Sequence, residues 1–68
     1  MRNELIQLIR ATPFVPFDVH MSSGATYTVM HPELVALASA ALYVVQGDET
    51  HRCSLLHITG VSVKEPVQ

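Results

Sequence analysis

The first ten residues combine a hydrophobic stripe of helical spacing with polar positions between its members. Leu5, Leu8 and Ile9 stand at i, i+3 and i+4, which places them on one side of a helix. Pro13 ends the pattern, because the residue before a proline is pushed toward an extended conformation. The spacing therefore predicts a short helix over residues 3–10. A helix of about two turns does not hold itself in water, so its stripe should pack on the rest of the fold.

The next segment changes to the pattern of a β-hairpin. From Phe17 to Met21 apolar and polar residues alternate, which is the two-residue period of a half-buried strand. Residues 22–24 read Ser-Ser-Gly, the composition of a tight turn in which glycine supplies a positive φ. Residues 26–30 are rich in β-branched and aromatic side chains and predict the returning strand.

The most apolar segment, residues 34–45, has two interpretations. Its alanine and leucine content suits a helix, but that helix would be apolar all round and a chain of 68 residues cannot surround it. The preferred interpretation is two short strands, residues 34–37 and 41–46, because the second half is rich in β-branched and aromatic residues. The helix is kept as the alternative.

Two further strands are predicted in the last third of the chain, at residues 51–56 and 58–63. They follow residues 47–50, which have the composition of a turn. The order of elements is then one helix followed by five or six short antiparallel strands.

This order predicts a mainly β fold. Open strand edges invite uncontrolled pairing, so a meander of this kind is expected to close into a small barrel. The expected fold is a single domain over residues 1–68: the helix, a small five- or six-stranded antiparallel barrel over about residues 14–64, and a frayed tail at 65–68.

Composition adds an expectation of assembly. Hydrophobic residues make up 49% of the chain and charged residues 15%, where an ordinary soluble domain has about 25% charged residues. This balance excludes intrinsic disorder, and a single cysteine, Cys53, excludes a disulfide scaffold and favours the cytoplasm. The longest apolar run is shorter than the about 20 residues of a membrane span. With few charges to solvate a monomer, we expect a homo-oligomer.

The charge inventory limits the partners. The net charge is −2 with four basic residues, whereas phosphate contacts by basic residues supply most of the affinity of nucleic-acid binders. We therefore expect no DNA partner, and RNA binding would need one basic residue repeated around a symmetric ring. The expected partner is a second copy of the chain. The apolar residues expected to carry this assembly are Leu34, Leu37, Leu42 and Val44.

The histidines offer two kinds of candidate chemistry. His51 and Cys53 lie two apart on one predicted strand face near His57, and zinc binds such side chains. A structural zinc site takes four ligands, however, so a metal or small-molecule binder is the remote alternative. A Cys53–His57 nucleophile pair lacks an orienting group and an oxyanion hole. We predict no enzymatic activity, no metal and no cofactor.

A His-Pro-Glu segment at residues 31–33 is the most distinctive short motif. It either presents its two polar side chains to a ligand at the barrel rim or forms a corner whose bend the proline fixes, and the corner is preferred. The residues that would contact a ligand or RNA are His31, Glu33, Arg52 and His57.

The order of elements resembles that of Sm-like barrels of the bacterial Hfq type over about residues 3–64. Residues 15–24 sit where that family has a strand ending in a glycine turn, and residues 57–61 resemble the stretch leading into its last strand. The resemblance implies a barrel whose middle and last strands pair across subunits in an RNA-binding ring. Val29 replaces a second glycine of the family, and Leu56 replaces a basic residue before the histidine. We therefore expect the family's fold and assembly more than its RNA binding.

The chain also resembles a set of small uncharacterised bacterial proteins with a Pro-Phe-Xaa-Pro-Phe segment and a His-Pro-(Asp/Glu) segment. Here these are residues 13–17 and 31–33. This resemblance implies no activity. The sequence therefore predicts a non-catalytic, self-associating interaction or scaffold module. The alternative is an Sm-like RNA-binding ring that uses His57 with Arg52 or Lys64.

Overall fold

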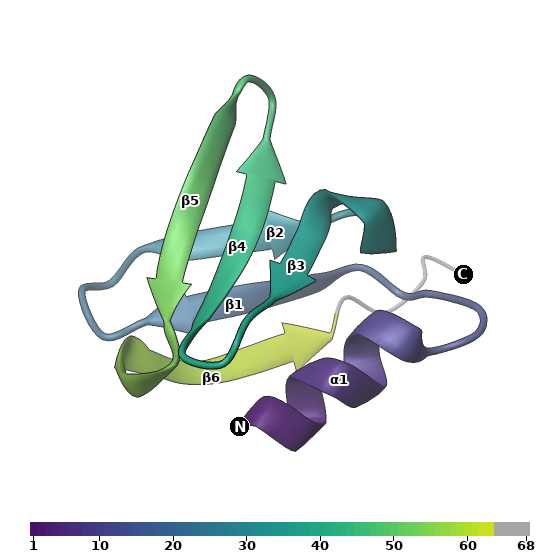
Figure 1. Ribbon diagram of the computed structural model, residues 1–68, viewed down its shortest axis with the longest axis horizontal. Helices are drawn as coiled ribbons and strands as arrows, with labels where there is room; N and C mark the ends of the chain where they lie inside the picture. The colour runs from purple at the N-terminus through teal and green to yellow at the C-terminus, as the bar shows by residue number, and fades with distance from the viewer. Residues whose placement is uncertain (64–68) are drawn as a thin grey trace.

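The computed structural model describes residues 1–63, which form one α-helix followed by six short strands (Figure 1). The strands pair into two three-stranded antiparallel sheets, with the orders β2-β1-β6 and β3-β4-β5. The elements are α1 (Arg2–Arg10), β1 (Phe17–Met21), β2 (Thr26–Val29), the 3₁₀ turn η1 (Pro32–Leu34), β3 (Val35–Leu37), β4 (Ala41–Gln46), β5 (Glu49–Ser54), the 3₁₀ turn η2 (Leu55–His57) and β6 (Ile58–Val63). The mainly β prediction is confirmed, whereas the predicted tail lies outside the described residues.

The helix α1 lies against the sheets through the stripe that the sequence predicts. Leu5 is completely buried, and Leu8 and Ile9 are partly buried against the core. The helix begins one residue earlier than expected, at Arg2, and ends where Ala11 turns to an extended conformation.

The first sheet is built around β1, which pairs with β2 on one side and with β6 on the other. Phe17 and Val19 are completely buried, while the alternating residues Asp18 and His20 face outward and are only partly covered. The β1–β2 turn contains Gly24 at a φ of 96°, a conformation that glycine adopts without steric cost. The predicted hairpin is confirmed.

The second sheet decides between the two interpretations of the alanine-rich segment. Residues 35–37 and 41–46 form β3 and β4, paired antiparallel from Val35 opposite Val44 to Leu37 opposite Leu42. The two-strand prediction is confirmed, except that Leu34 belongs to η1.

The strand predicted at residues 51–56 ends earlier than expected. Residues 55–57 form η2 instead of continuing the strand, so β5 ends at Ser54. This turn carries the chain from the second sheet to the first, and its ends are tied to neighbouring loops. The Leu55 N–H donates to the Ala40 carbonyl at 3.0 Å, and the Ser22 N–H donates to the His57 carbonyl at 2.8 Å.

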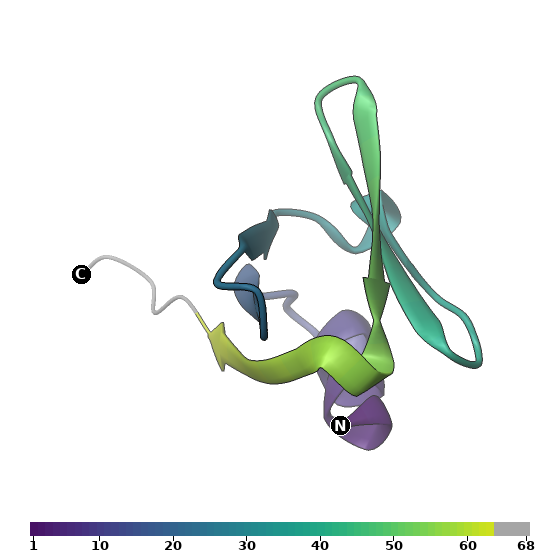
Figure 2. The ribbon, with the colours of Figure 1, turned by 90° about the vertical axis from the view of Figure 1, so that its left-hand side faces the viewer.

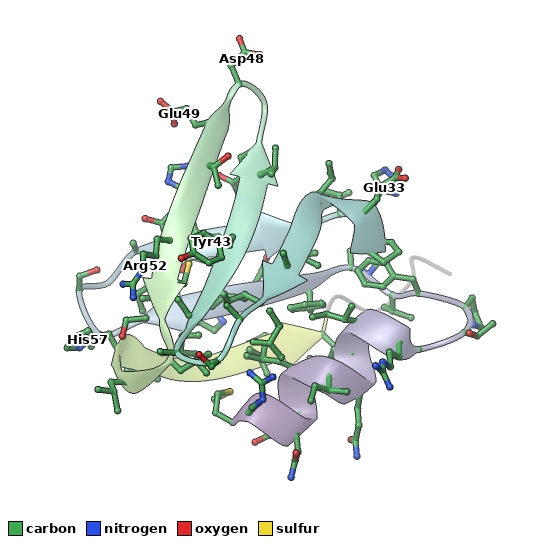
Figure 3. All side chains as sticks on the ribbon, in the orientation of Figure 1. Glu33, Tyr43, Asp48, Glu49, Arg52 and His57 are labelled. Carbon is green, nitrogen blue, oxygen red and sulfur yellow. The ribbon has the colours of Figure 1, made fainter. Side chains whose placement is uncertain are left out.

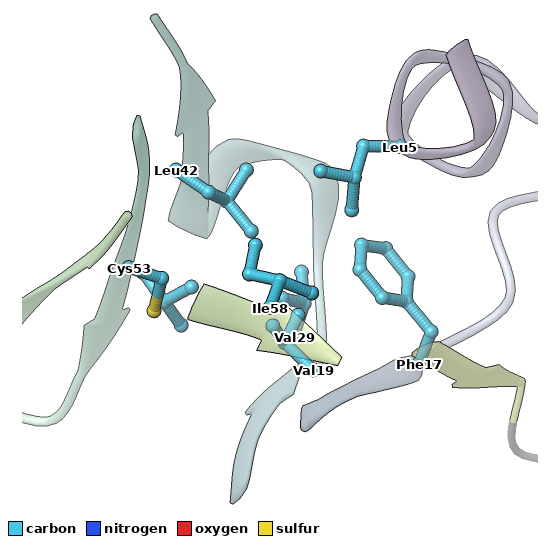
Figure 4. Close-up of a cluster of buried hydrophobic side chains, with 8 residues drawn as sticks. Leu5, Phe17, Val19, Val29, Leu42, Cys53 and Ile58 are labelled. Atoms are coloured by element: carbon cyan, nitrogen blue, oxygen red, sulfur yellow. The ribbon is translucent and has the colours of Figure 1, made fainter. Parts of the chain in front are cut away.

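The two sheets enclose one core, to which the helix contributes Leu5 (Figure 4). Its buried members come from α1 and from five of the six strands: Leu5, Phe17, Val19, Val29, Leu42, Val44, Cys53 and Ile58. Strand pairing within residues 1–63 gives two sheets and no closed barrel. The ladder is interrupted after β2, where His31 is extended and Pro32 supplies no N–H. Across this gap the Gln46 side chain on β4 donates to the Thr28 carbonyl on β2 at 3.3 Å.

The described part of the chain contains no helix that is long and apolar enough to cross a membrane.

The Cys53 thiol in this core gives a pH-dependent prediction. Burial raises the pKa of the Cys53 thiol above its ordinary value. The unfolded chain therefore loses this proton first, from about pH 8.5, while the folded chain keeps it. The stability due to the neutral thiol is fully present below that pH and is lost as the pH rises toward the folded pKa.

We expect urea titrations at rising alkaline pH to show a steeper loss of stability for the wild type than for Cys53→Ala. In the native wild type the thiol should also resist a thiol reagent until denaturant is added. Equal pH slopes for the two proteins, or rapid native labelling, would show that the thiol is not held neutral in the core.

Candidate functional site

A groove of about 230 Å³ lies between α1 and β3. Its walls are aliphatic, with one arginine toward each end of the helix. The lining residues are Arg2, Ile6, Ile9, Arg10, Val35 and Leu37. The groove stays open because α1 packs against the core through Leu5, which leaves the side of the helix next to Leu5 only partly covered.

The two arginines give the groove a positive charge. They are eight positions apart on α1, or about 12 Å along the axis at 1.5 Å per residue. Arg2 Nη1 donates to the Ala38 carbonyl just beyond β3, which holds one guanidinium across the mouth of the groove. Within residues 1–63 neither arginine forms a salt bridge. Both therefore keep hydrogen-bond donors for an acidic group.

Strand β3 forms the other wall and is an edge strand. It pairs with β4 on one side and has no strand partner on the other within residues 1–63. An edge of this kind offers unpaired N–H and C=O groups to another chain. The groove therefore places apolar, charged and backbone groups on one surface.

The four residues predicted to carry assembly divide between this surface and the core. Leu37 lines the groove, and Leu34 is partly exposed in η1. Leu42 and Val44 are completely buried, because alternate residues of β4 face the core of the same chain. These two side chains therefore have no surface to offer a second subunit, and the sequence pattern alone does not distinguish the inward face from the outward one.

The four residues predicted to contact a ligand or RNA do not form one site. His31 and Glu33 are exposed around η1, consistent with the corner interpretation. Figure 3 shows Arg52 and His57 on the opposite side of the molecule from Glu33. Arg52 stands directly across from Tyr43 on β4, so an aromatic residue that the sequence analysis missed joins this second pair.

A polar cluster covers the outer face of the first sheet, and sequence reasoning did not identify it. His20 on β1 bridges the strands on both sides, with Nδ1 3.3 Å from Thr26 Oγ1 and Nε2 2.8 Å from Ser62 Oγ. Beside it, the Thr28 hydroxyl donates to Asp18 Oδ1 at 2.6 Å. In the sequence, the only sign of this cluster was the alternation of polar with apolar residues along β1. That alternation shows that a polar residue faces outward, but it does not show which side chains on the neighbouring strands that residue contacts.

This cluster has the chemistry of a structural network. The imidazole contacts a serine hydroxyl, but its other nitrogen faces threonine instead of the carboxylate that orients a catalytic histidine. Both hydrogen bonds of His20 are exposed to solvent. These hydrogen bonds tie three strands together.

The histidine and cysteine side chains considered for metal binding are engaged separately. His51 stacks on Tyr27 with ring centroids 4.5 Å apart, and its Nε2 lies 3.4 Å from Glu49 Oε1. Cys53 is buried and His57 is exposed. No group of three or more His, Cys, Asp or Glu side chains is placed to hold a metal ion within the described residues.

Comparisons with protein-family models, with curated proteins and with solved structures found no match to this chain. The geometry of the groove and of the outer sheet faces is therefore the basis for assigning a function.

Proposed function

We propose that this chain is a non-catalytic, self-associating interaction module and that the α1–β3 groove is its contact surface. The observation that carries the proposal is an apolar groove beside the unpaired edge of β3, with an arginine toward each end. The aliphatic floor provides hydrophobic attraction, which is non-directional. The arginines and the strand edge provide the charged groups and hydrogen bonds that fix the orientation of the bound partner.

The size and lining of the groove favour a protein partner over a substrate. Small-molecule sites usually enclose about 300–1,000 Å³, and this groove is smaller and open. Among the residues that the structure describes, its lining holds aliphatic side chains and arginines, with no carboxylate, imidazole, hydroxyl or thiol that would serve as a general base or nucleophile. Such a surface suits a few side chains of another protein.

The same proposal includes a Sm-like or SH3-like arrangement of the strands. Its support is the order of pairing: β6 returns to pair with β1, and β3 follows β2 across η1 before pairing with β4. An open arrangement of this kind leaves strand edges that a second copy would cover.

The test replaces one groove residue that is not among the side chains packed against the core. Ile6→Lys places a charge on the apolar floor, whereas Gln7→Lys makes the same addition at an exposed neighbouring position. We expect Ile6→Lys to shift sedimentation velocity profiles toward the monomer and Gln7→Lys to leave the assembly intact, with both variants folded by circular dichroism. Equal behaviour of the two variants would remove the groove from the contact surface.

A second candidate, RNA binding by a ring of subunits, is favoured by one observation. Arg52 and Tyr43 stand opposite each other on the second sheet and His57 lies exposed on the same side (Figure 3). Cationic and aromatic side chains together bind single-stranded nucleic acid by charge and stacking. Filter binding at low salt separates the candidates, because self-association alone retains no RNA.

A further inference from the structure

The β4–β5 hairpin extends away from the rest of the molecule (Figures 1 and 2). Gln46 pairs with Glu49, so the turn consists of two residues, Gly47 and Asp48. Gly47 has a φ of 61° and Asp48 has no positive φ, the pattern of a tight II′-type turn. The hairpin therefore ends in a narrow tip, where Asp48 and Glu49 are exposed (Figure 3).

The charge of this tip is opposite to that of the groove. Asp48 and Glu49 are the only adjacent pair of carboxylates within residues 1–63. Asp48 forms no salt bridge among those residues, and Glu49 has only His51 beside it, at 3.4 Å. Elsewhere Glu4 and Glu33 stand singly, and Asp18 already accepts the Thr28 hydroxyl. The tip thus offers two carboxylates, and the groove offers two arginines.

The spacing of the two arginines along α1 is wide enough for the two strands of one tip to lie between them. Paired strands lie about 4.8 Å apart, so a two-stranded tip is narrower than the about 12 Å of helix that separates Arg2 from Arg10. Figure 1 shows the tip directed away from α1, and in the turned view of Figure 2 the two again lie at opposite ends. A hairpin therefore does not reach the groove of its own chain.

We propose that the β4–β5 tip of a second copy docks into the α1–β3 groove, placing Asp48 and Glu49 against Arg2 and Arg10. This inference rests on the proposed self-association and names its geometry. The contact joins two different surfaces of the same chain, so it is heterologous, and repeated contacts close into a ring or continue as a filament.

The test is a charge exchange followed by sedimentation and light scattering at low ionic strength. Arg10→Glu and Asp48→Lys each place like charges together, which costs much more than the loss of one exposed ion pair. We expect each single variant to weaken self-association at least about tenfold. The double variant carries the exchanged pair at every contact and should return to within about threefold of the wild type.

Glu33→Lys is the matched control, because it reverses an exposed carboxylate that neither lines the groove nor belongs to the hairpin tip. It should associate as the wild type does. The inference is overturned if Asp48→Lys behaves like Glu33→Lys, or if the double variant stays dissociated while folded. In either case a loss of assembly in Ile6→Lys would still support the groove as a contact surface, whereas a monomeric wild type would contradict the proposed function as well.

Discussion

Replacing Leu42 by alanine should lower the free energy of unfolding by about 2–5 kcal/mol. Leu42 is completely buried on β4 among core side chains from both sheets (Figure 4). Truncation removes its hydrophobic transfer energy and leaves a cavity that a packed core fills only in part. A domain of this size has about 3–10 kcal/mol of stability in total, at roughly 0.05–0.15 kcal/mol per residue. The variant should therefore lose a large fraction of its total stability.

Leu56→Ala is the matched control, because it deletes the same atoms from a side chain that is 92% exposed. Urea unfolding of both variants at one fixed protein concentration separates folding from association, since self-association makes apparent stability depend on concentration. Leu56→Ala should change the free energy of unfolding by less than about 0.5 kcal/mol. Similar losses in the two variants would contradict the assignment of Leu42 to the core.

Leu5→Ala should have an effect of the same order, about 2–5 kcal/mol, with a local signature as well. Leu5 is the completely buried residue of α1. A nine-residue helix is unstable by itself and is held by packing, so removing this contact weakens the helix and the groove wall together. Hydrogen exchange should show faster exchange of the α1 amides than of the amides in β1.

Gln7→Ala is the control for this position, because it is exposed on the same helix and alanine has a higher helix propensity. It should leave the stability unchanged or raise it slightly. If Leu5→Ala unfolds no more easily than Gln7→Ala, the helix is not anchored to the sheets through Leu5.

The fold is largely accessible from the sequence because its strongest signals are local. Alternation in residues 17–21 indicates both the strand and its buried face, and the i, i+3, i+4 stripe of residues 5–9 indicates the helix. The strand choice for residues 34–45 is also correct, because a helix apolar on every side has no surrounding protein in so short a chain.

The sites are less accessible because they combine residues that are distant in sequence. The groove joins Ile6 and Arg10 to Val35 and Leu37, and no local pattern indicates that these segments lie together. Likewise, the apolar character of Leu42 and Val44 in the sequence does not show whether these side chains pack in the core of one chain or in an interface between two chains. The predicted strand at residues 51–56 extends too far, because its last two residues, Leu55 and Leu56, belong to the 3₁₀ corner between the sheets.

The central claim is that this chain associates with itself, and the mass of the wild-type protein in solution tests it most directly. Light scattering coupled to size exclusion, over a concentration series at low ionic strength, gives that mass without labels. We predict a species at a multiple of the 7.5 kDa chain mass at micromolar concentration, whose association weakens as salt screens the groove arginines. A mass of 7.5 kDa throughout the series would contradict it.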